Sequence, residues 1–121
     1  ALFRNGPRFQ RRKRMTRLTT EFWVQAYLKH LNMAHIPAYV LRHGDDTAGT
    51  VLIKVNMLDG QARVYAQTYD LMADRREWAL HDSGAEQEID DLLSRQAARD
   101  PDLWTIEIES PSGIHLLELM G

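Results

Sequence analysis

Apolar residues and one histidine recur at the spacing of one helix face in the first third of the chain. They fall at i, i+3, i+4, i+7, i+8 and i+11, at Trp23, Ala26, Tyr27, His30, Leu31 and Ala34. This period of 3.6 predicts an α-helix with one continuous buried stripe. Thr19 or Thr20 can cap its first turn, and Pro37 ends it because proline lacks an amide donor and restricts the residue before it.

The middle of the chain alternates between apolar and polar residues, which predicts strands. Residues 38–42 read as extended, and residues 50–56 alternate cleanly. The expected faces of the second strand are Val51, Ile53 and Val55 inward, and Lys54 and Asn56 outward. The pair Asp59-Gly60 is a hairpin signal that leads into a strand at residues 62–69. A further short strand is expected at residues 78–80.

A second helix and two last strands are predicted towards the C-terminus. Asp82 or Ser83 can cap a helix that ends before Asp100. Residues 103–110 alternate in the manner of a half-exposed antiparallel strand. Residues 114–120 are rich in leucine and are expected to return as its hairpin partner.

These elements predict an α+β domain. Their order is α-β-β-β-(β)-α-β-β, which favours a largely antiparallel sheet of five to six strands with two helices over one of its faces. The 121 residues are 44% hydrophobic and 26% charged, which fits one globular domain and excludes a disordered chain. We assign residues 15–121 to this single domain.

Positive charge is concentrated in residues 1–14. The net charge is −2, yet six of the 15 Lys and Arg residues precede residue 15, and the remainder holds 9 cations against 17 acids. An acidic body repels phosphate backbones, so nucleic-acid binding is expected only if this basic arm is native. Its strongest cluster is Arg11, Arg12, Lys13 and Arg14. Met15 has the character of a natural start, which favours reading residues 1–14 as a leader joined upstream.

Motifs for catalysis or metal binding are weak. Gly44 and Gly49 have the spacing of a phosphate loop but lack its lysine, so we interpret them as a hairpin loop. His30 and His35 lie about 140° apart around a helix and cannot share a metal ion. Cysteine is absent, which excludes disulfides and thiol chemistry. We assign no catalytic residue, metal or cofactor.

No apolar run approaches the ~20 residues of a membrane helix, so no membrane partner is expected and the predicted location is the cytoplasm.

One face of the predicted sheet is the tentative binding surface. It would combine Lys54 and Asn56 with Arg63 and Tyr65 of the neighbouring strand. Basic and aromatic groups interleaved on an open sheet are typical of proteins that stack single-stranded RNA. The alternative is that Tyr65 packs as a cross-strand partner and that Lys54 and Arg63 are ordinary solvated charges.

Several short segments resemble a small bacterial family of uncharacterised proteins, over residues 15–118. They are Trp23-Val24, Ala26-Tyr27-Leu28, Ile36-Pro37-Ala38, Gly44-Asp45, residues 49–56, Leu58-Asp59-Gly60, Trp78 and residues 100–104, with Glu107 and Glu109. The family is a domain of unknown function, so the resemblance implies a stand-alone bacterial protein and supplies no activity.

The favoured hypothesis is a non-enzymatic binding or accessory module that acts through protein contacts. A homodimer or partner interface is expected at the C-terminal hairpin, at residues 114–119, because free strand edges invite pairing. The first alternative is nucleic-acid binding through the arm and the sheet face. The second is a small enzyme whose site gathers Lys54, Asn56, Arg63 and a histidine.

Overall fold

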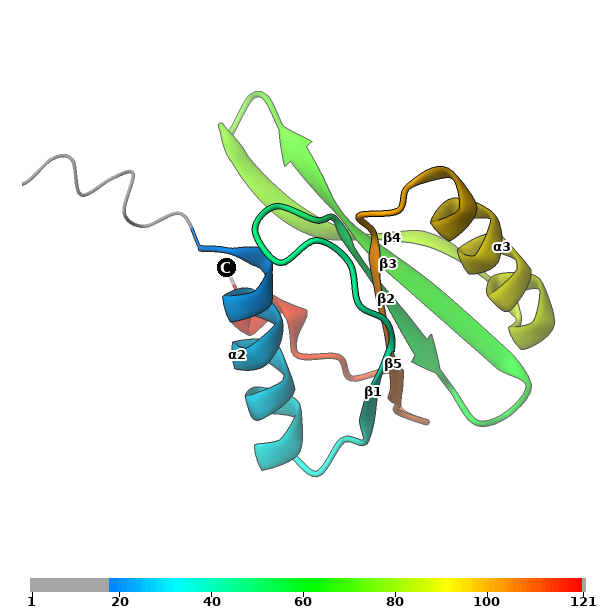
Figure 1. The fold of residues 1–121 in the computed structure, drawn as a ribbon. Helices are drawn as coiled ribbons and strands as arrows, with labels where there is room; N and C mark the ends of the chain where they lie inside the picture. The colour runs from blue at the N-terminus through cyan, green and yellow to red at the C-terminus, as the bar shows by residue number, and fades with distance from the viewer. Residues whose placement is uncertain (1–17, 121) are drawn as a thin grey trace, which may run out of the picture.

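Five strands form one mixed sheet in the order β1-β5-β2-β3-β4 (Figure 1). The computed structural model describes residues 18–120. Its elements are α2 (Thr20–Met33), β1 (Ala38–Arg42), β2 (Val51–Asn56), β3 (Gln61–Asp70), β4 (Arg75–Ala85), α3 (Glu86–Arg99), β5 (Trp104–Glu109) and the 3₁₀ helix η1 (Leu117–Met120). Only the β2–β5 pair is parallel, so the predicted α+β class with a largely antiparallel sheet is confirmed.

The two helices cover opposite faces of the sheet, and the expectation that both lie on one face is wrong (Figure 1). Under α2 lies a core formed with Ile53, Ile106 and other residues of β2 and β5. Under α3 lies a second core that includes Leu52 and Val64. Since β2 is covered on both sides, all six of its residues are buried.

The first helix begins where its sequence predicts. Thr19 is the N-cap, and its hydroxyl accepts a hydrogen bond from the Phe22 amide at 3.2 Å. The helix ends at Met33, before Pro37, and His35 then takes a left-handed φ of 60°. Its buried residues are Val24, Tyr27 and Leu31. Tyr27 and Leu31 belong to the predicted stripe, whereas Val24 lies beside it and Ala34, at the end of the predicted stripe, is exposed.

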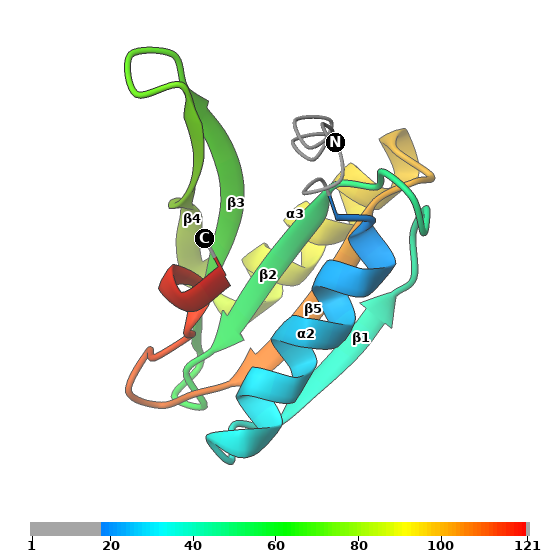
Figure 2. The same ribbon diagram turned by 90° about the vertical axis from the view of Figure 1, so that its left-hand side faces the viewer.

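The fourth strand is much longer than residues 78–80, and the hairpin of β3 and β4 extends beyond the rest of the sheet (Figure 2). Asp82 and Ser83 pair with β3 inside this hairpin, so neither of them caps the second helix. Ala85 holds the N-cap position without a side-chain bond. The amide of Glu86 instead donates to the Gly60 carbonyl.

The segment between β1 and β2 is not a hairpin loop, because β5 lies between these two strands. Gly44 and Gly49 both approach the carbonyl of Asp102 so closely that a Cβ at either position would overlap its oxygen. The Asp45 amide also donates to this oxygen, at 3.0 Å. The spacing of the two glycines therefore serves packing against the segment that precedes β5.

The predicted last strand, residues 114–120, is wrong. This segment leaves the sheet and ends in η1, where Leu117 is buried in the core under α2. The Tyr27 hydroxyl holds it by donating to the His115 carbonyl at 2.8 Å. The homodimer interface was expected there because of a free strand edge, and this segment has no such edge. The edge strands of the sheet are β1 and β4.

Candidate functional site

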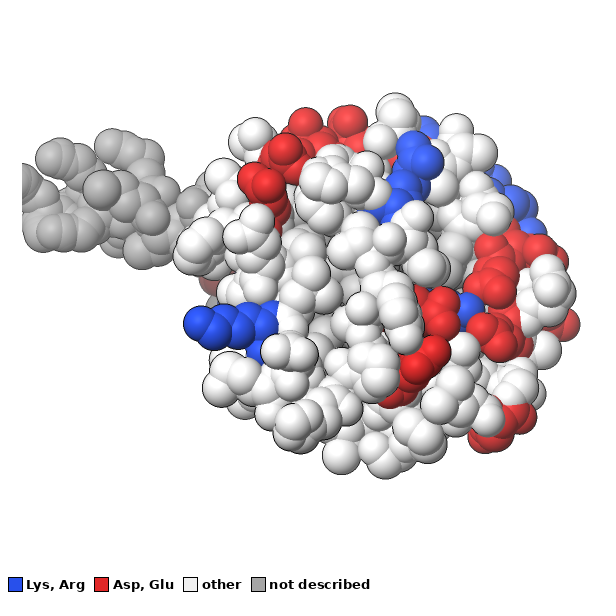
Figure 3. Space-filling view, turned by 60° about the horizontal axis from the view of Figure 1, so that its bottom comes forward, with Lys and Arg blue, Asp and Glu red and all other residues white. Residues whose placement is uncertain are grey.

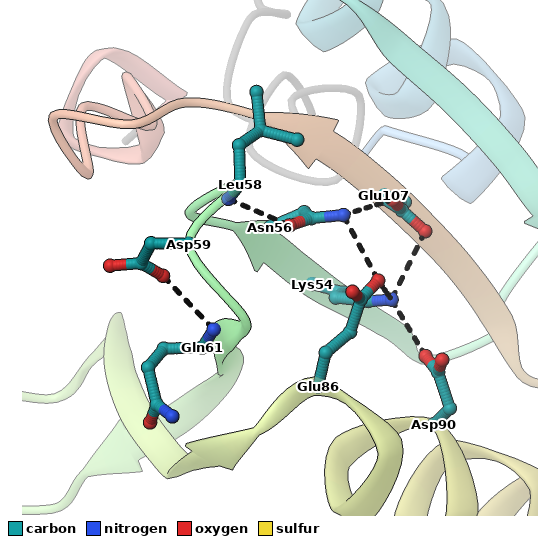
Figure 4. A network of polar contacts seen from close by, with 8 residues as sticks. All are labelled: Lys54, Asn56, Leu58, Asp59, Gln61, Glu86, Asp90 and Glu107. Atoms are coloured by element: carbon teal, nitrogen blue, oxygen red, sulfur yellow. Dashed lines mark hydrogen bonds and ion pairs between the residues drawn. The ribbon is translucent and has the colours of Figure 1, made fainter.

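Lys54 is buried in a polar network on the α3 face of the sheet (Figure 4). Only 2% of its surface is exposed. Its Nζ lies 2.8 Å from Glu86 Oε2, 2.6 Å from Asp90 Oδ1 and 3.3 Å from Glu107 Oε1. The expectation that Lys54 points to solvent is therefore wrong, because α3 covers this face of the strand.

Asn56 extends the same network. Its Nδ2 donates to Glu86 Oε2 at 3.0 Å and to Glu107 Oε2 at 3.1 Å, while its Oδ1 accepts from the Leu58 amide at 2.9 Å. The side-chain amide thus fixes two of the carboxylates that bind Lys54. A buried polar group is stabilised only when it has hydrogen-bond partners, and both the nitrogen and the oxygen of the Asn56 side chain have them.

The network stabilises the charged form of Lys54. Burial lowers the pKa of Lys54. Hydrogen bonds to Asp90 and Glu86 and the charge of Glu107 raise this pKa by more than burial lowers it, so the net shift is upwards. An ammonium held in this way is neither a base nor a nucleophile at neutral pH. With one cation and three carboxylates, the cluster keeps a net negative charge.

The acidic residues of α3 are the part of this network that the sequence analysis missed. Glu86 and Asp90 are four residues apart, which brings both to the same face of a helix. A pair of like charges is usually solvated, but here both face Lys54. A lysine among the apolar residues Val51, Leu52, Ile53 and Val55 was the available signal that such a pair has a buried cation as its partner.

Arg63 and Tyr65 lie on the opposite face of the sheet from Lys54 and Asn56. They pair with Val55 and Ile53, whose side chains belong to the α2 face. The Tyr65 ring packs against His115, with ring centroids 4.4 Å apart. The four residues predicted as one binding surface are thus divided into two pairs by the sheet.

The remaining sequence predictions fall outside this region. Arg11, Arg12, Lys13 and Arg14 lie outside the described residues. Within residues 18–120, no helix is both long and apolar enough to cross a membrane. The same part of the chain contains no group of three or more His, Asp or Glu side chains arranged to hold a metal ion.

Within residues 18–120, the outer edge of β1 has no partner strand and exposes apolar side chains. Tyr39, Val40 and Leu41 are 50%, 41% and 51% exposed. The other edge strand, β4, carries charged residues, which is the usual protection of an edge against unwanted pairing. Figure 3 shows mostly uncharged side chains over the middle of the view, between acidic side chains on the right and a second acidic group at the upper left.

The backbone of this edge is available for pairing. The Glu109 amide of β5 donates to the Pro37 carbonyl, and the pairing continues through Ala38 opposite Ile108. Because antiparallel partners alternate between bonded and non-bonded pairs, the amides and carbonyls of Ala38 and Val40 point away from β5. Among residues 18–120, no strand takes up these groups.

The chain matches proteins of known structure over most of its length. A family described as "Protein of unknown function (DUF1491)" matches residues 18–118. A crystal structure of a DUF1491 family protein from Caulobacter crescentus CB15 is 35% identical, with a TM-score of 0.74, over 82% of this chain and 94% of that chain. An NMR structure of a DUF1491 family protein from the same organism is 34% identical, with a TM-score of 0.69, over 81% and 90% of the two chains.

A solution structure of a protein from A. tumefaciens is 28% identical to this chain, with a TM-score of 0.66, and the match covers 78% of this chain and 87% of that chain. The chain matches no curated protein. The resemblance to a bacterial family of uncharacterised proteins is confirmed by these matches.

Proposed function

Since the chain belongs to the DUF1491 family, whose function is unknown, we propose from its geometry that it is a protein-binding module that adds an extended segment of a partner to the free edge of β1. The observation that carries this proposal is the exposed apolar run Tyr39–Leu41 on an edge strand. An edge that is both apolar and unpaired is costly to keep unless a partner covers it.

The backbone of β1 supplies the binding groups. Ala38 and Val40 direct amides and carbonyls outwards, so an added strand can form main-chain hydrogen bonds there, as in other domains that bind peptides by strand addition. The side chains of the added strand alternate between the two faces of the sheet. On the α3 face they meet Tyr39, which pairs with Glu107 of the Lys54 network.

Charge selects a basic partner over a second copy of this chain. Asp45 and Asp102 lie beyond the Arg42 end of β1, since the Asp45 amide bonds the Asp102 carbonyl. Glu109 lies at the other end, where its amide bonds Pro37. Residues 18–120 hold 8 cations against 17 acids, so two copies repel one another. We therefore expect an extended peptide with apolar residues flanked by Lys or Arg.

A displayed library of random linear peptides tests this proposal with the full chain as bait. We expect enriched peptides to combine apolar residues with Lys or Arg, and to bind the purified chain by calorimetry. Val40→Pro removes an amide that β5 does not use, and proline is tolerated on the open side of an edge strand. This variant should fold, by circular dichroism, and lose binding.

Val40→Ala is the matched control, because it trims the side chain and keeps the amide. It should retain most of the affinity. Equal binding by wild type and Val40→Pro, or a library without enrichment over an uncoated surface, contradicts strand addition at β1. Enrichment of acidic peptides contradicts the charge argument alone.

A further inference from the structure

A cleft of about 620 Å³ lies on the α2 side of the sheet, at the edge opposite β1. The first turn of α2, residues 47–51 and the β3–β4 hairpin line it. Figure 2 shows the β3–β4 hairpin curving away from the start of α2. The volume falls within the range of small-molecule sites, about 300–1,000 Å³.

One wall of the cleft is held rigidly by hydrogen bonds. The carboxylate of Asp45 accepts from the amides of Thr47 and Ala48 at 3.1 and 2.8 Å. The Thr20 hydroxyl donates to the Gly49 carbonyl at 2.8 Å and ties this loop to α2. The wall is therefore formed before any ligand arrives, which reduces the entropy that binding would cost.

Stacked aromatic rings form the apolar part of the cleft. Trp23 lies between Tyr27 and Trp78, with ring centroids 5.1 and 5.2 Å away. Both tryptophans line the cleft. Within residues 18–120, the buried indole nitrogen of Trp78 has no acceptor, whereas that of Trp104 donates to the Asp45 carbonyl at 2.8 Å. An unpaired buried donor costs about 1–3 kcal/mol, so an acceptor brought by a ligand would be favoured.

The charge of the cleft is opposite to that of the domain. No Asp or Glu is among its lining residues, and Arg76 is its one charged side chain among the described residues. Arg76 makes no ion pair in this part of the chain, whereas the neighbouring Arg75 binds Glu77 at 3.1 Å. The first amides of α2 are already used, since those of Thr20 and Glu21 donate to the carbonyls of Thr47 and Asp46. An anion must therefore be bound by Arg76.

We propose that this cleft binds a small organic carboxylate with a flat apolar body. The body lies against the rings of Trp23 and Trp78, and the carboxylate pairs with Arg76, whose planar guanidinium matches a carboxylate in two parallel hydrogen bonds. A single arginine suits a singly charged group, whereas phosphate usually takes several donors. This site is separate from the β1 edge and does not depend on it.

Nuclear magnetic resonance of the full chain labelled with ¹⁵N tests the site with 2-naphthoate as the probe. The chain contains three tryptophans, so their indole signals are easily resolved. We expect 2-naphthoate to move the Trp78 indole signal, because its rings lie against this side chain, and to leave in place the signal of Trp104, which does not line the cleft. The neutral analogue 2-naphthylmethanol and the non-planar anion pivalate should both bind more weakly.

Arg76→Gln should weaken the binding of 2-naphthoate about tenfold, because glutamine keeps an amide donor but loses the charge and one of the two parallel hydrogen bonds. Arg75→Gln is the matched control, because it also removes one exposed positive charge, from the adjacent position outside the cleft lining, and it should leave the affinity within about twofold. A Trp78 signal that stays in place overturns the proposal. So does equal binding of the neutral analogue, or an equal loss in the two arginine variants.

Discussion

At the scale of single residues, Lys54 shows how a charged side chain becomes part of a core. Three carboxylates surround its ammonium, and the side-chain amide of Asn56 holds two of these carboxylates, those of Glu86 and Glu107, in place. The lysine side chain is almost fully buried. Its stem packs in β2, whose other residues are apolar except for Asn56. Removing the cation therefore leaves three acids close together without their shared partner, which costs more than the ion pair itself contributes.

We expect Lys54→Met to lower the free energy of unfolding by about 3 kcal/mol, because the stem is replaced but the three carboxylates lose their cation. The value lies at the lower end of such effects, since Glu86 and Asp90 are 37% and 46% exposed and solvent screens them. Urea unfolding measures the change. Lys29→Met, at an exposed position of α2, should stay within about 0.5 kcal/mol of wild type. Equal stabilities of the two variants contradict a central role for the network.

His115 makes stability depend on pH on the acid side. Burial lowers the pKa of His115, Glu118 raises it and Arg63 lowers it, with a net downward shift. The Leu117 amide donates to its Nδ1 at 3.0 Å, which requires that nitrogen to be free of a proton. The folded state thus favours the neutral ring, and its contribution is present above the usual pKa of ~6.5 and is lost as the pH falls below it.

We expect His115→Asn to reduce the loss of stability between about pH 7.5 and pH 5.5, because asparagine keeps an acceptor for the Leu117 amide but does not titrate in this range. The free energy of unfolding in urea at both pH values measures the difference. His81→Asn replaces an exposed histidine and should leave the difference as it is in wild type. A larger difference in His115→Asn is the contrary outcome.

At the scale of elements, local sequence patterns were sufficient to predict those features whose interacting residues lie close together in the sequence. The Thr19 cap, the helix at α2 and the turn at Asp59-Gly60 all depend on residues a few positions apart, and all three are confirmed. The buried face of α2 is confirmed at Tyr27 and Leu31 but not at Ala34. The insertion of β5 between β1 and β2 depends on pairs that are 53 residues apart with β2 and 63 to 70 residues apart with β1. Alternation in β2 indicated one buried face, and only the position of α3 shows that the other face is buried too.

The strand predicted for residues 114–120 was wrong for a related reason. Its leucines were consistent with a strand, but alternation over a few residues also arises when a chain crosses the end of a core. Leu117 is 1% exposed and Leu119 is 58% exposed, so only one of them contributes to the core. The candidate site was predictable in its residues, Lys54 and Asn56, but its acidic partners and its burial were not.

We expect Leu117→Ala to destabilise the domain by about 2–4 kcal/mol, the cost of a cavity in a packed core. Leu119→Ala should change stability by less than about 0.5 kcal/mol, because its side chain is exposed. Thermal or urea unfolding of the two variants provides the comparison. A hairpin strand at this position would give the two leucines similar effects, since both positions, two apart, would then share one face.

At the scale of the whole molecule, charge is unevenly distributed in three ways. Acidic residues dominate residues 18–120, the cleft beside Arg76 has no acidic lining residue, and the sequence places six cations in residues 1–14. Lys54 and Arg63, which the sequence suggests as part of an RNA-binding surface, do not form one positively charged surface. Lys54 is neutralised by its carboxylates, and Arg63 lies on the other face of the sheet.

We therefore expect nucleic-acid binding only when the N-terminal arm is present. A chain that begins at Met15 has 9 cations against 17 acids, so we expect it not to bind single-stranded RNA in a fluorescence polarisation assay at physiological salt. The full chain should bind weakly, with an affinity that falls steeply with salt because each phosphate contact releases counterions. Equal binding by the two chains would mean that the folded domain itself holds RNA. The acidic body could then do so only through a local site such as the cleft at Arg76, and Arg76→Gln in the shorter chain would reveal it.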